Sequence, residues 1–317
     1  MKDMKGTLYL LCAAFIWGFA LVAQKAGMTY MDVFGFTSVR CLLGGVSMLP
    51  LVVYRAKKAR SKAIGESQPE AAAANASPAT STAQAATAKD YILGSVECGL
   101  FLLGIMLFQQ FGLPHTTVGK AAFITALYIP LTPLIQIFFG KKTPRTVWFG
   151  GGVALIGLYL LCFTGGLSGF GFGDLCMLGA ALAAALQMIA VEKWVQRLDG
   201  VTLSCFQLFV VGLICLPFAI ASGNLTIDAI GKTLIPILYA GLCSCGLGYT
   251  FQILGQKYTT AAKAAILLSL ETVFSLLAGL IFYHELLSAV EYAGCLVMFL
   301  GVLLSQRTPK KKCHPFG

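Results

Sequence analysis

The stretch FQILGQKYTTAAKAA, residues 251–265, decides the fold because the chain carries a second version of it, FQQFGLPHTTVGKAA, at residues 108–122. The two stretches agree at eight of fifteen positions and begin 143 residues apart. Both keep a lysine inside otherwise apolar surroundings. This agreement indicates that one larger unit occurs twice in the chain.

The duplication extends well beyond these two stretches. A shift of 167 residues aligns Asp32 with Asp199, and further along the chain a shift of 143 residues aligns Lys120 with Lys263. Between these two regions lies one long connector that only the first copy contains. The chain therefore reads as two related halves.

The composition predicts an all-α integral membrane protein. Hydrophobic residues make up 57% of the chain, charged residues 11%, and the mean hydropathy is +0.81. Soluble domains are usually about 45–50% apolar and about 25% charged. So little charge cannot cover a water-exposed surface, and we expect the lipid bilayer to surround the protein.

The net charge of +10 does not indicate a nucleic-acid partner. Lysines and arginines stand in short clusters between apolar runs, which is the pattern of membrane topology rather than of a basic stripe. Most of the 11 cysteines lie inside apolar runs without a paired C-x-x-C spacing. We therefore expect no metal site and no cofactor.

Ten apolar stretches are long enough to cross a bilayer, which takes about 20 residues. They are expected at residues 6–26, 33–54, 91–113, 119–139, 146–164, 173–192, 201–222, 233–254, 261–283 and 288–306. Eighteen lysines and arginines then fall on one side of the membrane and three on the other. Positive residues stay inside, so we expect a multi-pass protein of the cell (plasma) membrane with both termini cytoplasmic.

The repeat sets the domain boundaries. Residues 1–55 hold the first two spans of the first repeat and residues 91–165 its other three. Residues 172–306 form the second repeat, and residues 307–317 a basic cytoplasmic tail. The low-complexity segment within residues 56–90 offers little that can pack, so we expect a disordered cytoplasmic linker there.

Five spans per repeat is an odd number, so the second copy enters the membrane from the opposite side. The two halves are then inverted five-helix repeats related by a two-fold axis in the membrane plane. This plan recurs in secondary transporters, where substrate binds near the midplane between the halves. We therefore interpret the chain as a transporter rather than an enzyme.

Five sequence stretches carry a family resemblance: AAFIWGFALVAQKAG, SVRCLLGG, AAFITALYIPLTPL, LLSLETVFSLLAG and FYHELLS. In this order they resemble the EamA family of the drug/metabolite transporter (DMT) superfamily. The resemblance implies ten spans and a cavity lined mainly by the third, fourth, eighth and ninth spans, with help from the first and sixth. It also implies movement of small metabolites, amino acids and related compounds among them, without fixing the substrate.

Lys120 and Lys263 each follow a Thr-Thr pair that can cap a helix, which puts the lysine in the first turn. A cation there opposes the helix dipole at a cost of about 0.3–1 kcal/mol. One interpretation is that each lysine reaches toward a lipid headgroup. The other is that lysine and helix N-terminus together attract an anionic substrate group.

Glu271 and Arg40 are charges inside expected spans, where an unpaired charge is costly. Glu271, which the repeat aligns with Tyr128, can carry a coupling proton, bind a substrate amine, or hold a neighbouring helix. For Arg40, aligned with Gln207, we expect a structural role with an acidic residue or backbone carbonyls as partner.

Further polar and aromatic side chains are candidates for the cavity wall. Together with the lysines and Glu271, the expected substrate-binding residues are Trp17, Gln109, Lys120, Tyr128, Gln187, Tyr249, Gln252, Lys263 and Glu271. Each aromatic ring among them can equally serve ordinary helix packing. Pro130 and Pro133 remove helical hydrogen bonds in the fourth span, which predicts a helix break or gate that frees the carbonyls of Ala126 and Ile129. The ninth span lacks both prolines, so we expect that the two halves are not functionally equivalent.

The remaining motifs separate the rival functions. No G-x-x-x-x-G-K-[ST] motif is present, so the chain cannot itself use ATP, although a partner ATPase could drive it as a permease subunit. No H-E-x-x-H or G-x-S-x-G motif indicates an intramembrane enzyme. An ion channel remains an alternative. Gly150, Gly157, Gly294 and Gly301 give small helix faces for contact within a monomer or a homodimer.

Overall fold

The computed structural model describes residues 2–66, 86–116, 118–162, 171–274, 281 and 288–306. Within these ranges the chain is helical apart from short connections, and no strand occurs. The all-α prediction is therefore confirmed. The expected basic tail, residues 307–317, lies outside the described residues.

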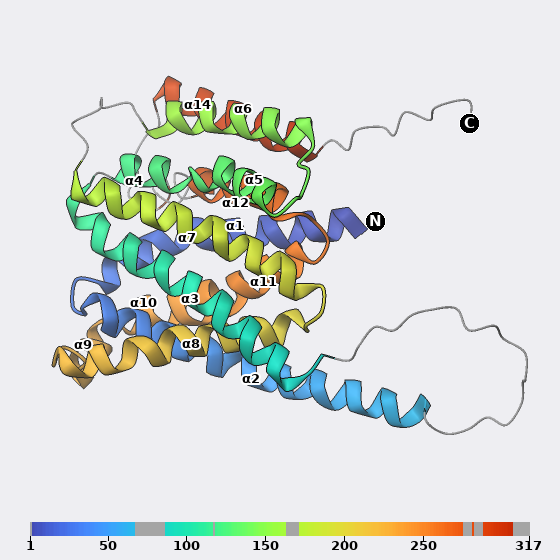
Figure 1. Ribbon diagram of the computed structural model, residues 1–317. Coiled ribbons are helices and arrows are strands. Elements are labelled where there is room, and N and C mark those ends of the chain that lie inside the picture. The colour runs from blue at the N-terminus through green and yellow to red at the C-terminus, as the bar shows by residue number, and fades with distance from the viewer. Residues whose placement is uncertain are drawn as a thin grey trace, which may run out of the picture.

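Figure 1 shows the arrangement of the helices that the structure describes. In chain order they are α1 (Lys2–Gly27), α2 (Val33–Glu66), α3 (Ala88–Gly112), the 3₁₀ turn η1 (Leu113–His115), α4 (Val118–Thr125), α5 (Tyr128–Phe138), α6 (Arg145–Cys162), α7 (Phe172–Val195), α8 (Gly200–Ala221), α9 (Ile227–Lys232), α10 (Leu234–Leu238), the π-helix η2 (Tyr239–Gly248), α11 (Tyr249–Gln256), α12 (Ala261–Leu268) and α14 (Ala289–Gln306). Each of the ten expected spans overlaps at least one of these helices.

Five helical segments are long and apolar enough to cross a membrane. They are Val33–Lys58, Ala88–His115, Phe172–Val195, Gly200–Ala221 and Leu234–Gln256. Four shorter apolar helices accompany them at Met4–Ala20, Phe123–Phe138, Arg145–Leu160 and Tyr292–Ser305. The protein is therefore a membrane protein by the length and composition of its helices.

The disordered linker that we predicted at residues 56–90 is too long, because helix occupies both of its ends. Helix α2 continues to Glu66, because the sequence AKKARSKA consists largely of strong helix formers. Helix α3 already begins at Ala88, where Thr87 and Asp90 form a capping box: the Thr87 hydroxyl accepts from the Asp90 amide, and the Asp90 carboxylate accepts from the Thr87 amide. Residues 67–85 lie outside the described residues.

The helices pack in pairs that join the first half of the chain to the second. Helix α2 packs on α8, α3 on α7, α6 on α14 and α5 on α12, while α1 packs on η2 and α11. In Figure 1 the α6–α14 pair forms one edge of the molecule and the α2–α8 pair the other. The elements between these edges surround the cavity described below.

Glycines allow α6 and α14 to approach closely. A Cβ atom on Gly157 would collide with the backbone of α14 at Met298, and one on Gly150 would lie 2.6 Å from the backbone nitrogen of Ser305. On the other helix, a Cβ atom on Gly301 would collide with the backbone of α6 at Ala154. The small faces predicted from the sequence therefore meet each other within one chain.

The expected fourth span is broken just before Pro130, whereas Pro133 lies inside α5 and does not end it. Helix α4 ends at Thr125 and α5 begins at Tyr128, which puts Pro130 in a first helical turn, where its missing N–H costs little. The Ala126 carbonyl is not free, contrary to expectation, because the Ile129 amide donates to it at 2.9 Å.

The ninth span is broken at the equivalent place without any proline. Helix α12 ends at Leu268, a turn follows, and helix resumes at Glu271. The Ser269 hydroxyl donates to the Ile266 carbonyl at 2.8 Å, a side-chain bond that bends helices. The two halves therefore share this break although only the first carries prolines, and a functional difference between them stays a prediction.

One end of the bundle carries ion pairs that each join the two halves; we call it the basic end. The pairs are Arg55 with Asp199 at 2.7 Å, Lys193 with Glu97 at 2.9 Å, and Lys141 with Glu192 at 3.1 Å. The far end of the described structure holds α9, where Lys232 pairs with Asp228 inside one helix. The halves are thus tied together by ion pairs at the basic end.

Candidate functional site

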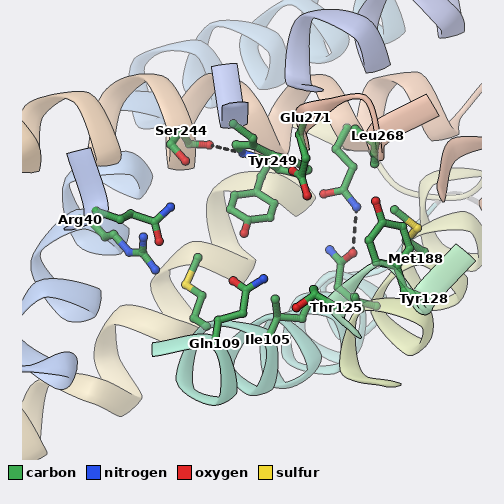
Figure 2. A pocket seen from close by; sticks show the side chains of 16 residues that line it. Arg40, Ile105, Gln109, Thr125, Tyr128, Met188, Ser244, Tyr249, Leu268 and Glu271 are labelled. Carbon is green, nitrogen blue, oxygen red and sulfur yellow. Dashed lines mark hydrogen bonds between the residues drawn. The ribbon is translucent and has the colours of Figure 1, made fainter. Parts of the chain in front are cut away.

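A cavity of about 110 Å³ lies where the two halves meet. Its wall comes from α1, α2, α3, α4, α5, α7, η2, α11, α12 and the residue after the α12 break (Figure 2). The lining residues are Trp17, Gln24, Arg40, Ile105, Met106, Gln109, Thr125, Tyr128, Ala184, Gln187, Met188, Ser244, Tyr249, Gln252, Leu268 and Glu271. The wall combines apolar and aromatic side chains with a few polar and charged groups, which is typical of a small-molecule site.

The two broken helices deliver equivalent residues to the cavity. Tyr128 is the first residue of α5, and Glu271 is the first helical residue after the break that follows α12. The repeat aligns these two positions, and both side chains line the cavity. Irregular backbone at membrane depth is tolerated where it lines a cavity, and these breaks lie at such a place.

Arg40 forms the cationic part of the wall. It is 3% exposed, and its guanidinium lies 5.3 Å from the centre of the Phe36 ring. In the amide orientation that satisfies both ends of Gln110, the guanidinium Nη2 donates to the Gln110 oxygen at 2.8 Å. Its Nε atom is buried without a hydrogen-bond partner, and no carboxylate of the described residues pairs with it.

Glu271 supplies the anionic part of the wall. Figure 2 shows Tyr249 between Arg40 and Glu271, and this tyrosine is within electrostatic reach of both charges. Among the described residues, Glu271 takes part in no ion pair. The cavity thus holds a cation and an anion on separate parts of its wall, with an aromatic ring between them.

A chain of amides runs along one side of the cavity. Gln252 Nε2 donates to Gln187 Oε1 at 2.9 Å, and Gln187 Nε2 donates to Gln207 Oε1 at 3.5 Å. Gln256 Nε2 fixes the neighbouring backbone by donating to the Met188 carbonyl at 2.9 Å. Within the described structure, Gln252 Oε1 is buried without a partner, so it can accept a hydrogen bond from a bound solute.

Trp17 joins α1 to the π-helix η2. Its indole Nε1 donates to the Ser244 carbonyl at 3.2 Å, and its ring lies 4.8 Å from the Tyr249 ring, centre to centre. A Cβ atom on Gly248 would lie 2.5 Å from Trp17 Nε1, so only glycine leaves room for the indole here. π-Helical turns are rare and concentrate at functional sites.

Seven of the nine predicted substrate-binding residues lie together in this wall: Trp17, Gln109, Tyr128, Gln187, Tyr249, Gln252 and Glu271. Lys263 does not line the cavity; it lies in the first turn of α12, and its amide donates to the capping Thr260 hydroxyl at 3.4 Å. Lys120 lies in the first turn of α4, but its side chain is outside the described part of the chain. Arg40, for which we expected a structural role, also lines the cavity.

Sequence reasoning missed several lining residues and the π-helix. Gln24, Thr125, Met188 and Ser244 carry no repeat signature, since none of them stands at a position that the two halves share as a polar pair. The glycine-rich stretch AGLCSCGLG of η2 is the one signal that could have indicated irregular helix. The wall also includes the second span through Arg40, beyond the spans that the resemblance implies.

The geometry described above is that of a helical membrane protein with a solute cavity between two related halves. The chain matches the EamA-like transporter family over residues 4–163 and 171–306, and it belongs to this family. It is a membrane transporter by family membership.

Relatives of similar length bear transporter names. An "uncharacterized transporter" of Archaeoglobus fulgidus is 26% identical over 309 residues, covering 96% of this chain and 86% of the relative. The uncharacterized transporter YoaV of Bacillus subtilis is 23% identical, covering 96% of this chain and 98% of the relative. A solved crystal structure with 16% identity superposes with a TM-score of 0.72 over 95% of this chain and 96% of its own, which shows the fold.

Proposed function

We propose that the protein is a secondary transporter of small polar metabolites, of the kind of amino acids and related compounds. It works without ATP, by alternating access between two inverted five-helix halves that together cross the membrane ten times. The basic end faces the cytoplasm of a cell whose plasma membrane holds the protein, because basic residues favour the inner side.

The pattern of helix contacts supports the inverted repeat. Under the repeat, the α2–α8, α5–α12 and α6–α14 pairs each exchange their two members and so map onto themselves. The α3–α7 pair maps onto the pair formed by α11 and α1. The breaks before Tyr128 and before Glu271 are likewise equivalent. This is the contact pattern that a two-fold axis relating the halves produces.

The observation that carries the proposal is the separation of unpaired charge in the cavity. Arg40 offers a buried Nε donor that nothing in the described chain satisfies, and Glu271 offers a carboxylate beyond Tyr249. A guanidinium binds a carboxylate with directed, charge-assisted hydrogen bonds. A solute with a carboxylate at one end and an amino group at the other satisfies both charges, and amino acids have this form.

The small volume also favours small solutes. A cavity of about 110 Å³ is well below the roughly 300–1,000 Å³ of pockets that hold drug-sized ligands. Glu271 is also the residue we assign to a coupling proton, because an unpaired carboxyl group inside a span can exchange protons through a wetted cavity.

Thermal stabilisation of the purified protein tests the assignment. The ligand panel contains amino acids, their decarboxylated amines, their amides and simple carboxylates. A ligand at 100 times its Kd stabilises the folded protein by about 2.7 kcal/mol. We expect amino acids to stabilise the protein, and amines or carboxylates alone to do so less.

Arg40→Gln removes the cation, and Lys232→Gln is the matched control, since it removes one positive charge from exposed α9. The stabilisation should disappear in Arg40→Gln and persist in Lys232→Gln. Stabilisation by amino acids that Arg40→Gln leaves intact would exclude the carboxylate-binding role of Arg40.

A further inference from the structure

The carboxylate of Glu192, at the basic end, contacts three other segments of the chain. Its Oε2 atom accepts from Gln136 Nε2 at 2.6 Å and from the Ala261 amide at 3.0 Å, while its Oε1 atom pairs with Lys141 Nζ at 3.1 Å. These contacts join α7 to the end of α5, to the connection after α5 and to the start of α12. We call these four residues the Glu192 clamp.

The clamp is more enclosed than the other ion pairs at the basic end. The Glu192 side chain is 14% exposed, compared with 28% for Asp199 and 34% for Glu97. Its partner Gln136 is fully buried, and the Ala261 amide is an otherwise unpaired helix-terminal donor. Hydrogen bonds to a carboxylate are about twice as strong as neutral ones, and solvent screens exposed pairs far more than enclosed ones.

The clamp joins three helices that line the cavity, α5, α7 and α12. It lies just beyond the end of the cavity that Met188 lines, which we call the cavity floor. Glu192 follows the lining residue Met188 by four residues, so it sits about 6 Å further along the same face of α7. Ala261 precedes the lining residue Leu268 by seven residues, about 10 Å along α12. Between floor and clamp, the Gln256 side chain is 0% exposed and bonds the Met188 carbonyl.

We propose that Glu192 is a positioning residue that holds the basic end of the cavity shut by tying α5, α7 and α12 together. This inference rests on the proposed alternating access. Opening toward the basic end requires α5 and α12 to separate from α7, and the clamp opposes that separation. Loss of the clamp then moves the protein toward the state that is open at the basic end.

The clamp belongs to one side only. The repeat aligns Glu192 with Lys25 and Gln136 with Gly279, so the opposite end has no carboxylate and no amide at the equivalent positions. Closure of that end must therefore use other groups. The clamp makes the two closed states unequal in free energy and favours the state that is shut at the basic end.

Cysteine labelling from each side of the membrane tests the clamp. The protein, with its native cysteines replaced, carries either Met188→Cys on the cavity floor or Gln24→Cys at the other end of the cavity, in proteoliposomes of known orientation. A membrane-impermeant maleimide is the probe. In Glu192→Ala, labelling of Met188→Cys from the basic side should rise about tenfold or more, and labelling of Gln24→Cys from the opposite side should fall.

The matched control is Arg55→Ala, which removes an exposed ion pair between the halves at the same end. It should change either labelling rate by less than about fivefold. If Glu192→Ala raises both rates, the residue merely stabilises the fold, and the clamp is refuted. Unchanged rates in Glu192→Ala refute it as well.

A separate arm distinguishes failure of the clamp from failure of alternating access. In a variant with both cysteines and an intact Glu192, a bulky maleimide on Gln24→Cys wedges that end open. Alternating access predicts slower labelling of Met188→Cys from the basic side. If the wedge has no effect, alternating access fails; if it works while Glu192→Ala shifts nothing, only the clamp fails.

Discussion

Replacing Gly157 by alanine should separate α6 from α14, and the structure gives the size of the effect. The added Cβ would collide with the backbone nitrogen of Met298 and lie 2.7 Å from the Gly294 carbonyl oxygen. Both obstacles are backbone atoms, so no side-chain rotation relieves the clash and the helices must move apart. Overpacking of this kind costs about 1–3 kcal/mol, from which up to about 1 kcal/mol of gained helix propensity is subtracted.

Gly152→Ala is the matched control in the same helix. None of the described atoms outside its own stretch of α6 lies within 4 Å of a Cβ built there, so only the gain in helix propensity remains. Both variants gain the same helix propensity, so thermal unfolding in detergent, followed by circular dichroism, should place Gly157→Ala about 2–12 °C below Gly152→Ala, from about 1–3 kcal/mol of clash at about 2–4 °C per kcal/mol. Gly152→Ala should melt at or slightly above wild type. If Gly157→Ala melts no lower than Gly152→Ala, the close approach of the two helices is refuted.

Three further substitutions test the cavity. Trp17→Phe keeps the aromatic contact with Tyr249 but loses the hydrogen bond to the Ser244 carbonyl. Chemical denaturation should therefore show a free energy of unfolding lower by about 0.5–1.5 kcal/mol. An unchanged denaturation midpoint would mean that the bond is not formed. Glu271→Gln keeps the shape of the wall but removes both the titratable group and the partner of the substrate's amino group. Exchange of substrate should therefore persist only at a raised KM, and uptake should lose its response to an imposed pH gradient. A retained response would assign the proton elsewhere. Lys263→Ala changes a residue that does not line the cavity, and salt screens its charge from the site. The ligand Kd, measured by thermal shifts, should therefore change less than about twofold. A larger increase in Kd would restore the anion-binding interpretation.

Much of the cavity wall was predictable because the repeat marks positions rather than residue types. The aligned pair Gln109 and Gln252 lines the cavity from both halves, and so does the pair Tyr128 and Glu271, although their chemistry differs. Duplication preserves helix register, so equivalent positions keep facing the interface between the halves after the side chains diverge.

The remainder depends on contacts that a linear sequence does not display. The break at Ser269 occurs without a proline, and the hydroxyl bond to the preceding turn is no sequence signal for it, because Ser47 makes the same bond inside the continuous helix α2. In the same way, Gln110 and Gln109 are neighbours of one type, yet one bonds Arg40 and the other lines the cavity. Only the packing of α2 against α3 separates their roles.

Glu192 was overlooked for a related reason. A charged residue at the end of an apolar helix usually lies at the membrane interface, where it needs no partner. The residues that bind it come from α5 and α12, which are distant in sequence, and one of them contributes only a backbone amide. No residue pattern predicts such a donor.

Counterflow in proteoliposomes shows directly whether the protein carries amino acids by alternating access. Vesicles containing the protein are loaded with an unlabelled amino acid that stabilises it, and uptake of the labelled form is followed without ATP or any partner. The account predicts saturable uptake that internal substrate accelerates, and loss of this acceleration in Arg40→Gln but not in Lys232→Gln. Flux that rises linearly with concentration and ignores internal substrate would contradict it, because that behaviour belongs to a channel.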